Sequence, residues 1–487
     1  MLKPFGDARS IYHVVEPALR APSVYNTQPW SFRIIADDRI ELRASDGDGD
    51  DGSGCGRWDL LLHAPAPGPW PREYAISCGA ALMNLRLAVR MLGHDPVISL
   101  LPDPAGDPGL LASVQIAAGR VHKPGSLERE LYDAIWQRHT DRWPFSDTPV
   151  RPGILAEMEQ AAAREHGWLR PLHGTFARRW LKVAADADAA IAAARDGWES
   201  GRQDALGRAG TVAATGDDAA GADRPGYDAL LSQFRAELAQ RTGDSDSGSG
   251  IPLATLGPRP ATAKPPVRDF TLGGTVGGGT ERGEVGPGER FERHPQLMML
   301  FTDRDDPADW LRAGQALQRA LLTAASLGVS TSFLTQPLEL ADLAFRDDPQ
   351  HGRVRHPPGL AGHLGLPLHP HTVDASQRNS SSPVDRRGYV RRRLLGATPW
   401  LEVPQMVIRV GYPRDPAGKP DIRTPRREPD ITDARSDPPV RVARPPAGPC
   451  PPAGPRPPGG SPRTGQAGAG DRLETTWRPP GGRHHSS

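Results

Sequence analysis

The strongest pattern in the sequence is an apolar stripe on a helix that we predict from Trp310 to Leu327, ended by Gly328. Its apolar residues recur every three or four positions, so they share one face: Ala313, Ala316, Leu317, Ala320, Leu321, Ala324 and Leu327. A second stripe of this kind predicts a helix from Cys78 to Leu92. Each stripe has to be buried against other elements, so the chain must contain a packed core.

Shorter patterns predict the elements that cover these helices. Alternating apolar residues indicate strands over 31–35 and 40–43, which form a hairpin turning at Asp37 and Asp38, and further strands over 97–101, 111–117, 297–302 and 406–410. Helical spacing predicts helices over 9–20, 127–137 and 154–164, and alanine-rich helical segments between 178 and 240. This mixture favours the α+β class.

The composition shows that the core does not include the whole chain. Of 487 residues, 54 are glycine and 53 are proline, and only 6% are aromatic. Such a chain must be loop or disorder over a good part of its length. We assign this character to the stretches 45–72, 243–289 and 347–398, and to a disordered tail rich in proline, glycine and arginine over 431–487.

Several classes of function are excluded by simple counts. The net charge is +1, so no basic field indicates nucleic acid or an anionic membrane as a partner. The three cysteines are scattered, which fits neither a disulfide framework nor a zinc site. No apolar run could span a bilayer, and the first residues lack a signal sequence, so we expect a soluble cytoplasmic protein.

A glycine-rich segment and a group of four histidines do not indicate a nucleotide site or a metal site. The glycines between 273 and 279 neither follow a strand nor open a helix, so they support no dinucleotide or phosphate loop. Four histidines lie among prolines with neither helical spacing nor a nearby carboxylate: His356, His363, His369 and His371. We expect no metal there.

A polar loop follows the first predicted helix. It carries Ser23, Asn26 and Gln28 between Pro22 and Pro29. Proline fixes φ, so these side chains should be held in a stiff loop. A loop of this kind can hydrogen-bond the edge of a planar heterocycle. Taken alone, however, it is more simply interpreted as a helix exit followed by a turn.

Two basic segments could hold a phosphate. The first is the pentad of residues 138–142, which contains Arg138, His139, Thr140 and Arg142. Guanidinium groups offer forked donors and threonine adds a neutral one. The second segment, with Arg426 and Arg427, follows the last predicted strand. Taken alone, each could also be a solvated charge cluster.

Together these segments resemble the flavin-dependent nitroreductase family. The loop resembles the Pro-Ser-x-x-Asn-x-Gln-Pro-Trp loop of that family, and the pentad resembles its Arg-x-Ser/Thr-x-Arg/Lys motif, which grips the FMN phosphate. Residues 406–413 resemble its closing strand with Gly-Tyr-Pro, after which a basic pair returns to the phosphate. Three more blocks agree with the Acg branch of the family: 77–86, 313–317 and 334–339.

The order of these motifs implies a fused dimer. In ordinary members two subunits share each flavin, whereas here the loop lies early in the chain and both basic segments lie later. The resemblance therefore implies a nitroreductase-like fold of two fused lobes, 1–125 and 126–430, forming an intramolecular pseudo-dimer with one FMN. We expect a monomer that needs no second copy. One departure is Tyr25, where the Acg branch more often has histidine.

The resemblance also implies roles for single residues. Arg138, His139, Thr140, Arg426 and Arg427 would bind the FMN phosphate. The isoalloxazine edge would be bonded by Ser23, Asn26 and Gln28. Arg142 would lie near N1 of the flavin, where a cation stabilises the charge left by hydride transfer. The backbone of residues 331–336, expected to be a loop, would approach N5.

The implied function is an FMN-dependent oxidoreductase. It would pass hydride from NAD(P)H to a small electron-poor acceptor such as a nitroaromatic or a quinone. The alternative is a non-enzymatic protein that sequesters or stores FMN beneath a lid, with 243–289 or 347–398 as the lid. A third possibility, an interaction protein acting through its tail, would lose function but keep flavin when truncated after Asp430.

Overall fold

The computed structural model describes residues 4–45, 72–187, 251, 255, 290–339, 402–414 and 423–445. Residues 1–444 form one compact unit. The predicted irregular stretch 347–398 lies outside the described residues, as do most of the stretches 45–72 and 243–289 and the tail beyond 445. Of the helical segments predicted between 178 and 240, residues 178–187 are helical and the others lie outside the described residues.

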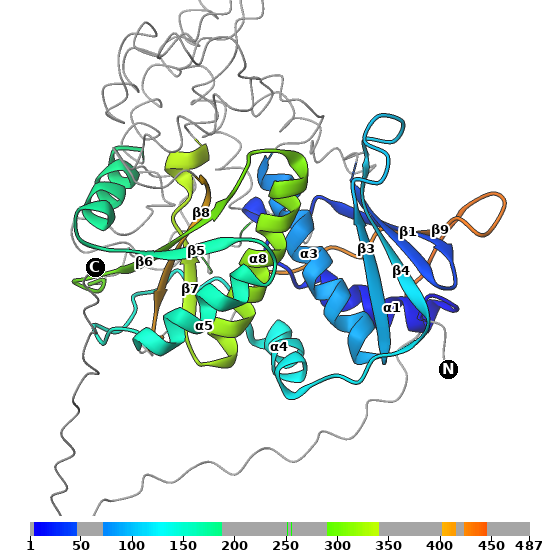
Figure 1. The fold of residues 1–487 in the computed structure, drawn as a ribbon, viewed down its shortest axis with the longest axis horizontal. Helices are drawn as coiled ribbons and strands as arrows, with labels where there is room; N and C mark the ends of the chain where they lie inside the picture. Colours follow the sequence, from blue (N-terminus) through cyan, green and yellow to red (C-terminus); the bar gives the residue numbers. More distant parts are fainter. Residues whose placement is uncertain are drawn as a thin grey trace, which may run out of the picture. The chain divides into compact units, whose positions relative to one another are not determined.

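The first lobe is built on a six-stranded sheet in the order β10-β9-β1-β2-β4-β3 (Figure 1). Its strands are β1 (Trp30–Ala36), β2 (Arg39–Ala44), β3 (His94–Leu100), β4 (Leu110–Val121), β9 (Ile431–Asp433) and β10 (Val440–Arg441). The predicted hairpin is confirmed, with Ile34 opposite Ile40 in an antiparallel pair. Residues 30, 32 and 34 of β1 and residues 40, 42 and 44 of β2 are buried and alternate with more exposed residues, as expected for a sheet covered on one face.

Two helices cover that face of the sheet. They are α1 (Ala8–Leu19), which starts at Asp7 as N-cap, and α3 (Arg72–Met91). The Asp7 carboxylate accepts a hydrogen bond from the amide of Ser10 at 3.0 Å, which satisfies a free donor of the first turn. Apolar residues of both helices and of β1, β2 and β4 make one core.

The second lobe has a four-stranded antiparallel sheet in the order β5-β6-β8-β7. Its strands are β5 (Trp168–Leu172), β6 (Gln296–Thr302), β7 (Ser330–Phe333) and β8 (Val403–Gly411). α5 (Pro152–Ala163) and α8 (Pro307–Ser326) pack on it and share its core. α4 (Ser126–Gln137) packs against both α3 and α8.

The lobes meet where α3 crosses α8, the two helices that the apolar stripes predicted (Figure 1). Two glycines, Gly79 on α3 and Gly314 on α8, allow the backbones to touch: a β-carbon at 314 would lie 2.0 Å from the carbonyl oxygen of Ile76. Beside this crossing, the amide of Gln318 donates to Asn84 at 2.8 Å. At this crossing the two lobes pack side by side, so that residues of both lobes face each other.

The predicted start of the tail at residue 431 is wrong. β9 pairs in parallel with β1, and Ile431 is 0% exposed within the core of the first lobe. A short segment with only one strongly apolar residue gives almost no periodic signal, so the sequence alone assigns it to the tail. The first lobe is therefore not one continuous stretch of sequence.

Other differences are smaller. The α+β class is confirmed, and each predicted strand and helix within the described residues has a counterpart. α3 starts six residues earlier than predicted, at Arg72, and the strands β5 and β7 were missed. The expected loop over 331–336 begins as part of β7. β7 has only four residues, which is too short to show an alternation.

We expect Ile431→Ala to lower the free energy of unfolding by about 3 kcal/mol, because it removes a fully buried aliphatic side chain. Chemical denaturation measures this effect. Val440→Ala on β10 is the matched control, since Val440 is 54% exposed and should change stability by less than about 0.5 kcal/mol. Equal effects of the two substitutions would contradict the place of β9 in the core.

Candidate functional site

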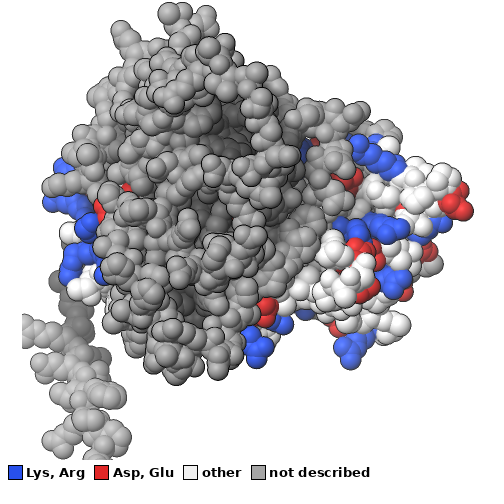
Figure 2. All heavy atoms as spheres, turned by 90° about the horizontal axis from the view of Figure 1, so that it is seen from above, with Lys and Arg blue, Asp and Glu red and all other residues white. Residues whose placement is uncertain are grey.

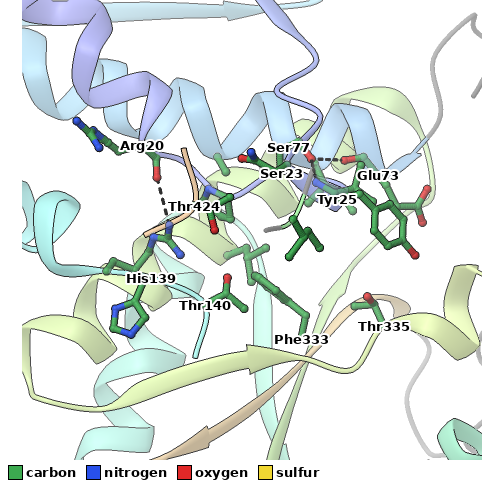
Figure 3. Close-up of a pocket in the computed structure, with 18 of the residues that line it drawn as sticks. Arg20, Ser23, Tyr25, Glu73, Ser77, His139, Thr140, Phe333, Thr335 and Thr424 are labelled. Atoms are coloured by element: carbon green, nitrogen blue, oxygen red, sulfur yellow. Dashed lines mark hydrogen bonds between the residues drawn. The ribbon is translucent and has the colours of Figure 1, made fainter. Parts of the chain in front are cut away.

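A pocket lies between the two lobes and is lined by residues of both α3 and α8 (Figure 3). The first lobe contributes the polar loop and α3. The second contributes the segment after α4, α8, β7, β8 and the basic segment near 426. Its charged and polar lining residues are Arg20, Ser23, Tyr25, Asn26, Glu73, Ser77, Arg138, His139, Thr140, Arg142, Thr335, Glu339, Arg423, Thr424 and Arg426.

The polar loop is fixed in a strained conformation. Its residues 24–26 form a short 3-10 helix, η1 (Val24–Asn26), and Tyr25, Asn26 and Gln28 have φ values of 45°, 58° and 49°. Non-glycine residues rarely adopt positive φ, and they cluster at functional sites. The loop is tied to α3, because the amide of Val24 donates to the hydroxyl of Ser77 at 3.1 Å. Surrounding contacts therefore hold a backbone that would otherwise relax.

The two arginines after β8 have different places. The Arg426 side chain lines the pocket and donates to the carbonyl oxygen of Leu19 and to Oδ1 of Asn26, both at 2.7 Å. The Arg427 side chain donates to the backbone carbonyls of Thr27 and Gln28. Arg426 thus belongs to the pocket wall, while Arg427 holds the loop from behind.

Arg138 is the most unusual group in the pocket. It is 8% exposed, and only its Nη2 has a partner, the carbonyl oxygen of Arg20 at 3.2 Å. Its Nε and Nη1 atoms are buried without a hydrogen bond. Burial, together with Arg426 and Arg423, lowers the pKa of Arg138 to about 9. Burial and Arg20 lower the pKa of Arg426 to about 10.

These cations form a candidate anion site. An unpaired buried guanidinium is costly, and an anion would both supply the missing acceptors and neutralise the charge. Phosphate suits this role because a guanidinium can donate two parallel bonds to it.

The segment after α4 is held on the edge of the second sheet. The amide of Asp141 donates to the carbonyl oxygen of Thr331 at 2.9 Å, and Thr140 forms an isolated parallel bridge with the same residue of β7. Thr140 is therefore positioned in the pocket by backbone contacts. His139 is exposed at the rim, and the Nη1 of Arg142 donates to the carbonyl oxygen of Thr255 at 3.3 Å.

The remainder of the pocket is apolar in the middle and acidic at the far end. Its apolar walls come from both lobes and include Ile76, Ala80, Leu317, Phe333 and Met406. Figure 3 shows Arg20 and His139 on one side of the pocket and Tyr25 and Glu73 on the other. The pocket can thus take a ligand with an anionic end and an apolar body.

The structure brings together seven of the predicted site residues: Ser23, Asn26, Arg138, His139, Thr140, Arg142 and Arg426. Asn26 accepts a hydrogen bond from Arg426 at 2.7 Å, so it lies beside one of the cations. Gln28 is 2% exposed and is not a lining residue; its side chain accepts from the amide of Arg427 at 3.1 Å. We therefore assign Gln28 and Arg427 to holding the loop instead of contacting a ligand.

Sequence reasoning gave no role to several lining residues: Arg20, Glu73, Ser77, Glu339 and Arg423. Ser77 and Glu339 belong to blocks that match the Acg branch, so a signal existed for them. Arg20 and Arg423 lie outside every motif, and only the folded chain shows that they approach Arg138 and Arg426.

Two classes of site receive no support from the described residues. They contain no group of three histidine, cysteine or acidic side chains that could hold a metal ion. None of the helices among them is long and apolar enough to cross a membrane. The described surface on the right of Figure 2 carries acidic and basic side chains interspersed, in line with the net charge of +1.

Over the residues that the structure describes, the fold and the pocket define a two-lobed α+β protein with a cationic, apolar-walled pocket between its lobes. Comparison with known proteins agrees with the family that the motifs resemble. "Putative NAD(P)H nitroreductase Rv3131" of Mycobacterium tuberculosis is 27% identical over 337 residues, which cover 69% of this chain and 79% of the relative. "Putative NAD(P)H nitroreductase acg" of the same organism is 28% identical over 331 residues, covering 68% and 81%. The resemblance to the Acg branch is confirmed by these relatives.

Two other comparisons add little. No protein-family model matches the chain. A solved structure of a mutant FMN and NADPH-dependent nitroreductase, NfnB from Sphigopyxis sp. strain HMH, is 14% identical with a TM-score of 0.25, and covers 61% of this chain and 94% of that one.

Proposed function

We propose that this protein is an FMN-dependent oxidoreductase that takes hydride from NAD(P)H and gives it to a small electron-poor acceptor, such as a nitroaromatic or a quinone. The observation that carries the proposal is the pair of unbonded, buried guanidinium nitrogens of Arg138 beside Arg426 in a pocket made by both lobes. The relatives named as NAD(P)H nitroreductases support the same class of activity.

The residues present fit FMN. Its phosphate would be held by Arg138, Thr140 and Arg426, with His139 at the rim. The apolar walls from Ile76, Leu317 and Met406 suit the flavin ring, which needs dry surfaces on its faces. Bound FMN would supply the hydride chemistry that amino-acid side chains lack.

The chain's own residues would bind and tune that group. Ser23 lines the pocket, and its hydroxyl already accepts a hydrogen bond from the amide of Gln28 at 3.0 Å, so its position is fixed. Arg142 is the residue that we assign to stabilising negative charge on the reduced ring, because it brings a cation to the pocket wall. The apolar walls would limit the access of water.

We also propose that the two lobes are a fused pseudo-dimer, and that one chain is sufficient. The polar loop comes from the first lobe, while Arg138 and Arg426 come from the second part of the chain. The division proposed here runs near residue 125, with β9 and β10 returned to the first lobe. A monomer with one FMN in analytical ultracentrifugation is the expected result.

We expect the purified protein to be yellow and to bleach within seconds when NADPH or NADH is added without oxygen. Visible absorption spectra of the flavin measure both properties. Addition of a nitroaromatic should then restore the oxidised spectrum. A protein that stays colourless after soaking with excess FMN would contradict the proposal.

The storage alternative has one observation in its favour. Ile251 lines the pocket and is buried, and the Thr255 carbonyl oxygen accepts the hydrogen bond from Arg142, so the predicted lid stretch reaches the site. A lid of this kind would exclude a nicotinamide. Flavin that only dithionite reduces, and that neither NADPH nor NADH reduces, would favour storage over the enzyme.

A further inference from the structure

The acidic end of the pocket contains a carboxylate that the proposed function does not use. Glu339 lines the pocket and is 5% exposed. Its Oε2 accepts a hydrogen bond from the Tyr25 hydroxyl at 2.7 Å, and its Oε1 accepts one from the Thr335 hydroxyl at 3.0 Å. Both donors are neutral.

Glu339 differs in this respect from the other buried acid of the pocket. Glu73 forms an ion pair with the guanidinium of its neighbour Arg72, and Arg72 in turn donates to the backbone of Gln405. Among the residues that the structure describes, no lysine, arginine or histidine forms an ion pair with Glu339. Two hydroxyl groups therefore orient this carboxylate without neutralising it.

A buried carboxylate is costly unless it is paired with a cation or with several donors. Each oxygen of a carboxylate can accept about two hydrogen bonds, and each oxygen of Glu339 has one. Each oxygen of Glu339 can therefore accept one more hydrogen bond, and because Glu339 lines the pocket, a bound molecule can donate it.

The position of Glu339 separates this end from the anion site. Its partners Tyr25 and Thr335 lie together on the side of the pocket away from Arg20 and His139 (Figure 3). The cationic end repels positive groups and attracts anions, whereas the Glu339 end does the reverse. The pocket is polarised along its length.

We propose that Glu339, oriented by Tyr25 and Thr335, forms a second subsite that binds the cationic or N–H-donating group of a small aromatic ligand. The identity of this ligand rests on the proposed function. Under that function, the group belongs either to the electron acceptor or to the carboxamide of the nicotinamide. The subsite selects against aromatic carboxylates, because their charge would face Glu339.

The test is isothermal titration calorimetry of the FMN-loaded protein with three molecules of one shape: benzamidinium, benzamide and benzoate. The expected order of affinity is benzamidinium, then benzamide, then benzoate. Glu339→Gln keeps the size and the hydrogen-bonding reach of the side chain but removes its charge. It should weaken benzamidinium binding at least tenfold and leave benzoate binding unchanged or stronger.

Tyr25→Phe is the matched control, because it removes a hydroxyl from the same cluster and leaves the carboxylate in place. It should change the affinity for benzamidinium by less than about fivefold. Should Glu339→Gln fail to fold, Glu339→Asp should still prefer the cation while binding it several-fold more weakly. The absorption spectrum of bound FMN, recorded on each variant, reports the proposed function separately from the subsite.

Two further titrations distinguish the sources of the bound group. A loss of nicotinamide affinity in Glu339→Gln assigns the subsite to the reductant, and a loss restricted to 4-nitrobenzylammonium assigns it to the acceptor. Equal affinities of the parent protein for benzamidinium and benzoate would overturn the proposal. The proposal would also be overturned if Glu339→Gln lost as much thermal stability as Tyr25→Phe but still preferred benzamidinium to benzoate. Glu339 would then serve only to link the two lobes through its hydrogen bond with Tyr25.

Discussion

Gly314→Ala is expected to lower the free energy of unfolding by about 3 kcal/mol or more, although alanine is the better helix former. The new β-carbon would lie 2.0 Å from the carbonyl oxygen of Ile76 and 2.8 Å from the α-carbon of Gly79. Both atoms belong to the backbone of α3, so no side-chain rotation can relieve the contact. α3 and α8 would have to move apart, and the hydrogen bond between Gln318 and Asn84 would stretch with them.

The matched control is Gly153→Ala, which places the same change in α5, where nothing lies within 4 Å of the new carbon. We expect that variant to be as stable as the parent or slightly more stable, since alanine favours the helix. Thermal and chemical denaturation of both variants measure the difference. Equal stabilities would mean that the two helices do not cross as closely as described.

Arg138→Ala is expected to act in opposite directions on ligand binding and on stability. It removes two donors that we assign to the phosphate, and charge-assisted hydrogen bonds contribute about 1.5–3 kcal/mol each, so FMN affinity should fall by a factor of about 100 to about 10,000. Without FMN, the variant loses an unpaired buried charge and should be at least as stable as the parent. Fluorescence titration and melting curves measure the two effects.

The same residue predicts a pH dependence. In the ligand-free protein the pKa of Arg138 is lowered from its ordinary value to about 9, so above about pH 9 the unfolded chain binds more protons than the folded one. The free energy of unfolding of the ligand-free protein should therefore rise with pH in this range. FMN affinity should fall over the same range, because the guanidinium must be charged to pair with phosphate.

A control for these measurements is Arg120→Ala. The Arg120 side chain is 74% exposed in a surface ion pair with Asp95, so its removal should change neither FMN affinity nor its pH dependence measurably. If Arg138→Ala binds FMN as tightly as the parent does, the assignment of the phosphate to this residue is wrong.

The elements that the sequence predicted well are those with a long or regular pattern. The stripe over 310–327 became α8, and the alternation on both sides of Asp37 became the hairpin of β1 and β2. β7 and β9 were missed because each has three or four residues, and their strand conformation comes from pairing with β8 and β1. Pairing partners distant in sequence leave no local pattern.

The residues predicted for the candidate site also fall into two groups, those that line the pocket and those that do not. Arg138, Thr140, Arg142, Ser23, Asn26 and Arg426 were identified from motifs, and they line one pocket. Gln28 and Arg427 were identified from the same motifs, but they contact each other and do not line the pocket, since a motif records which residues occur together and not which way each side chain points.

The sequence by itself determined the two central helices, the stiff polar loop and the basic segments, because spacing, proline content and charge are local properties of a chain. Only the tertiary structure decided that Ile431 belongs to the first lobe, that Arg138 has two unbonded nitrogens, and that Glu339 meets Tyr25 across 314 residues of sequence. Burial and pairing depend on which distant segments pack together, and that is settled by the free energy of the whole fold rather than by any one segment.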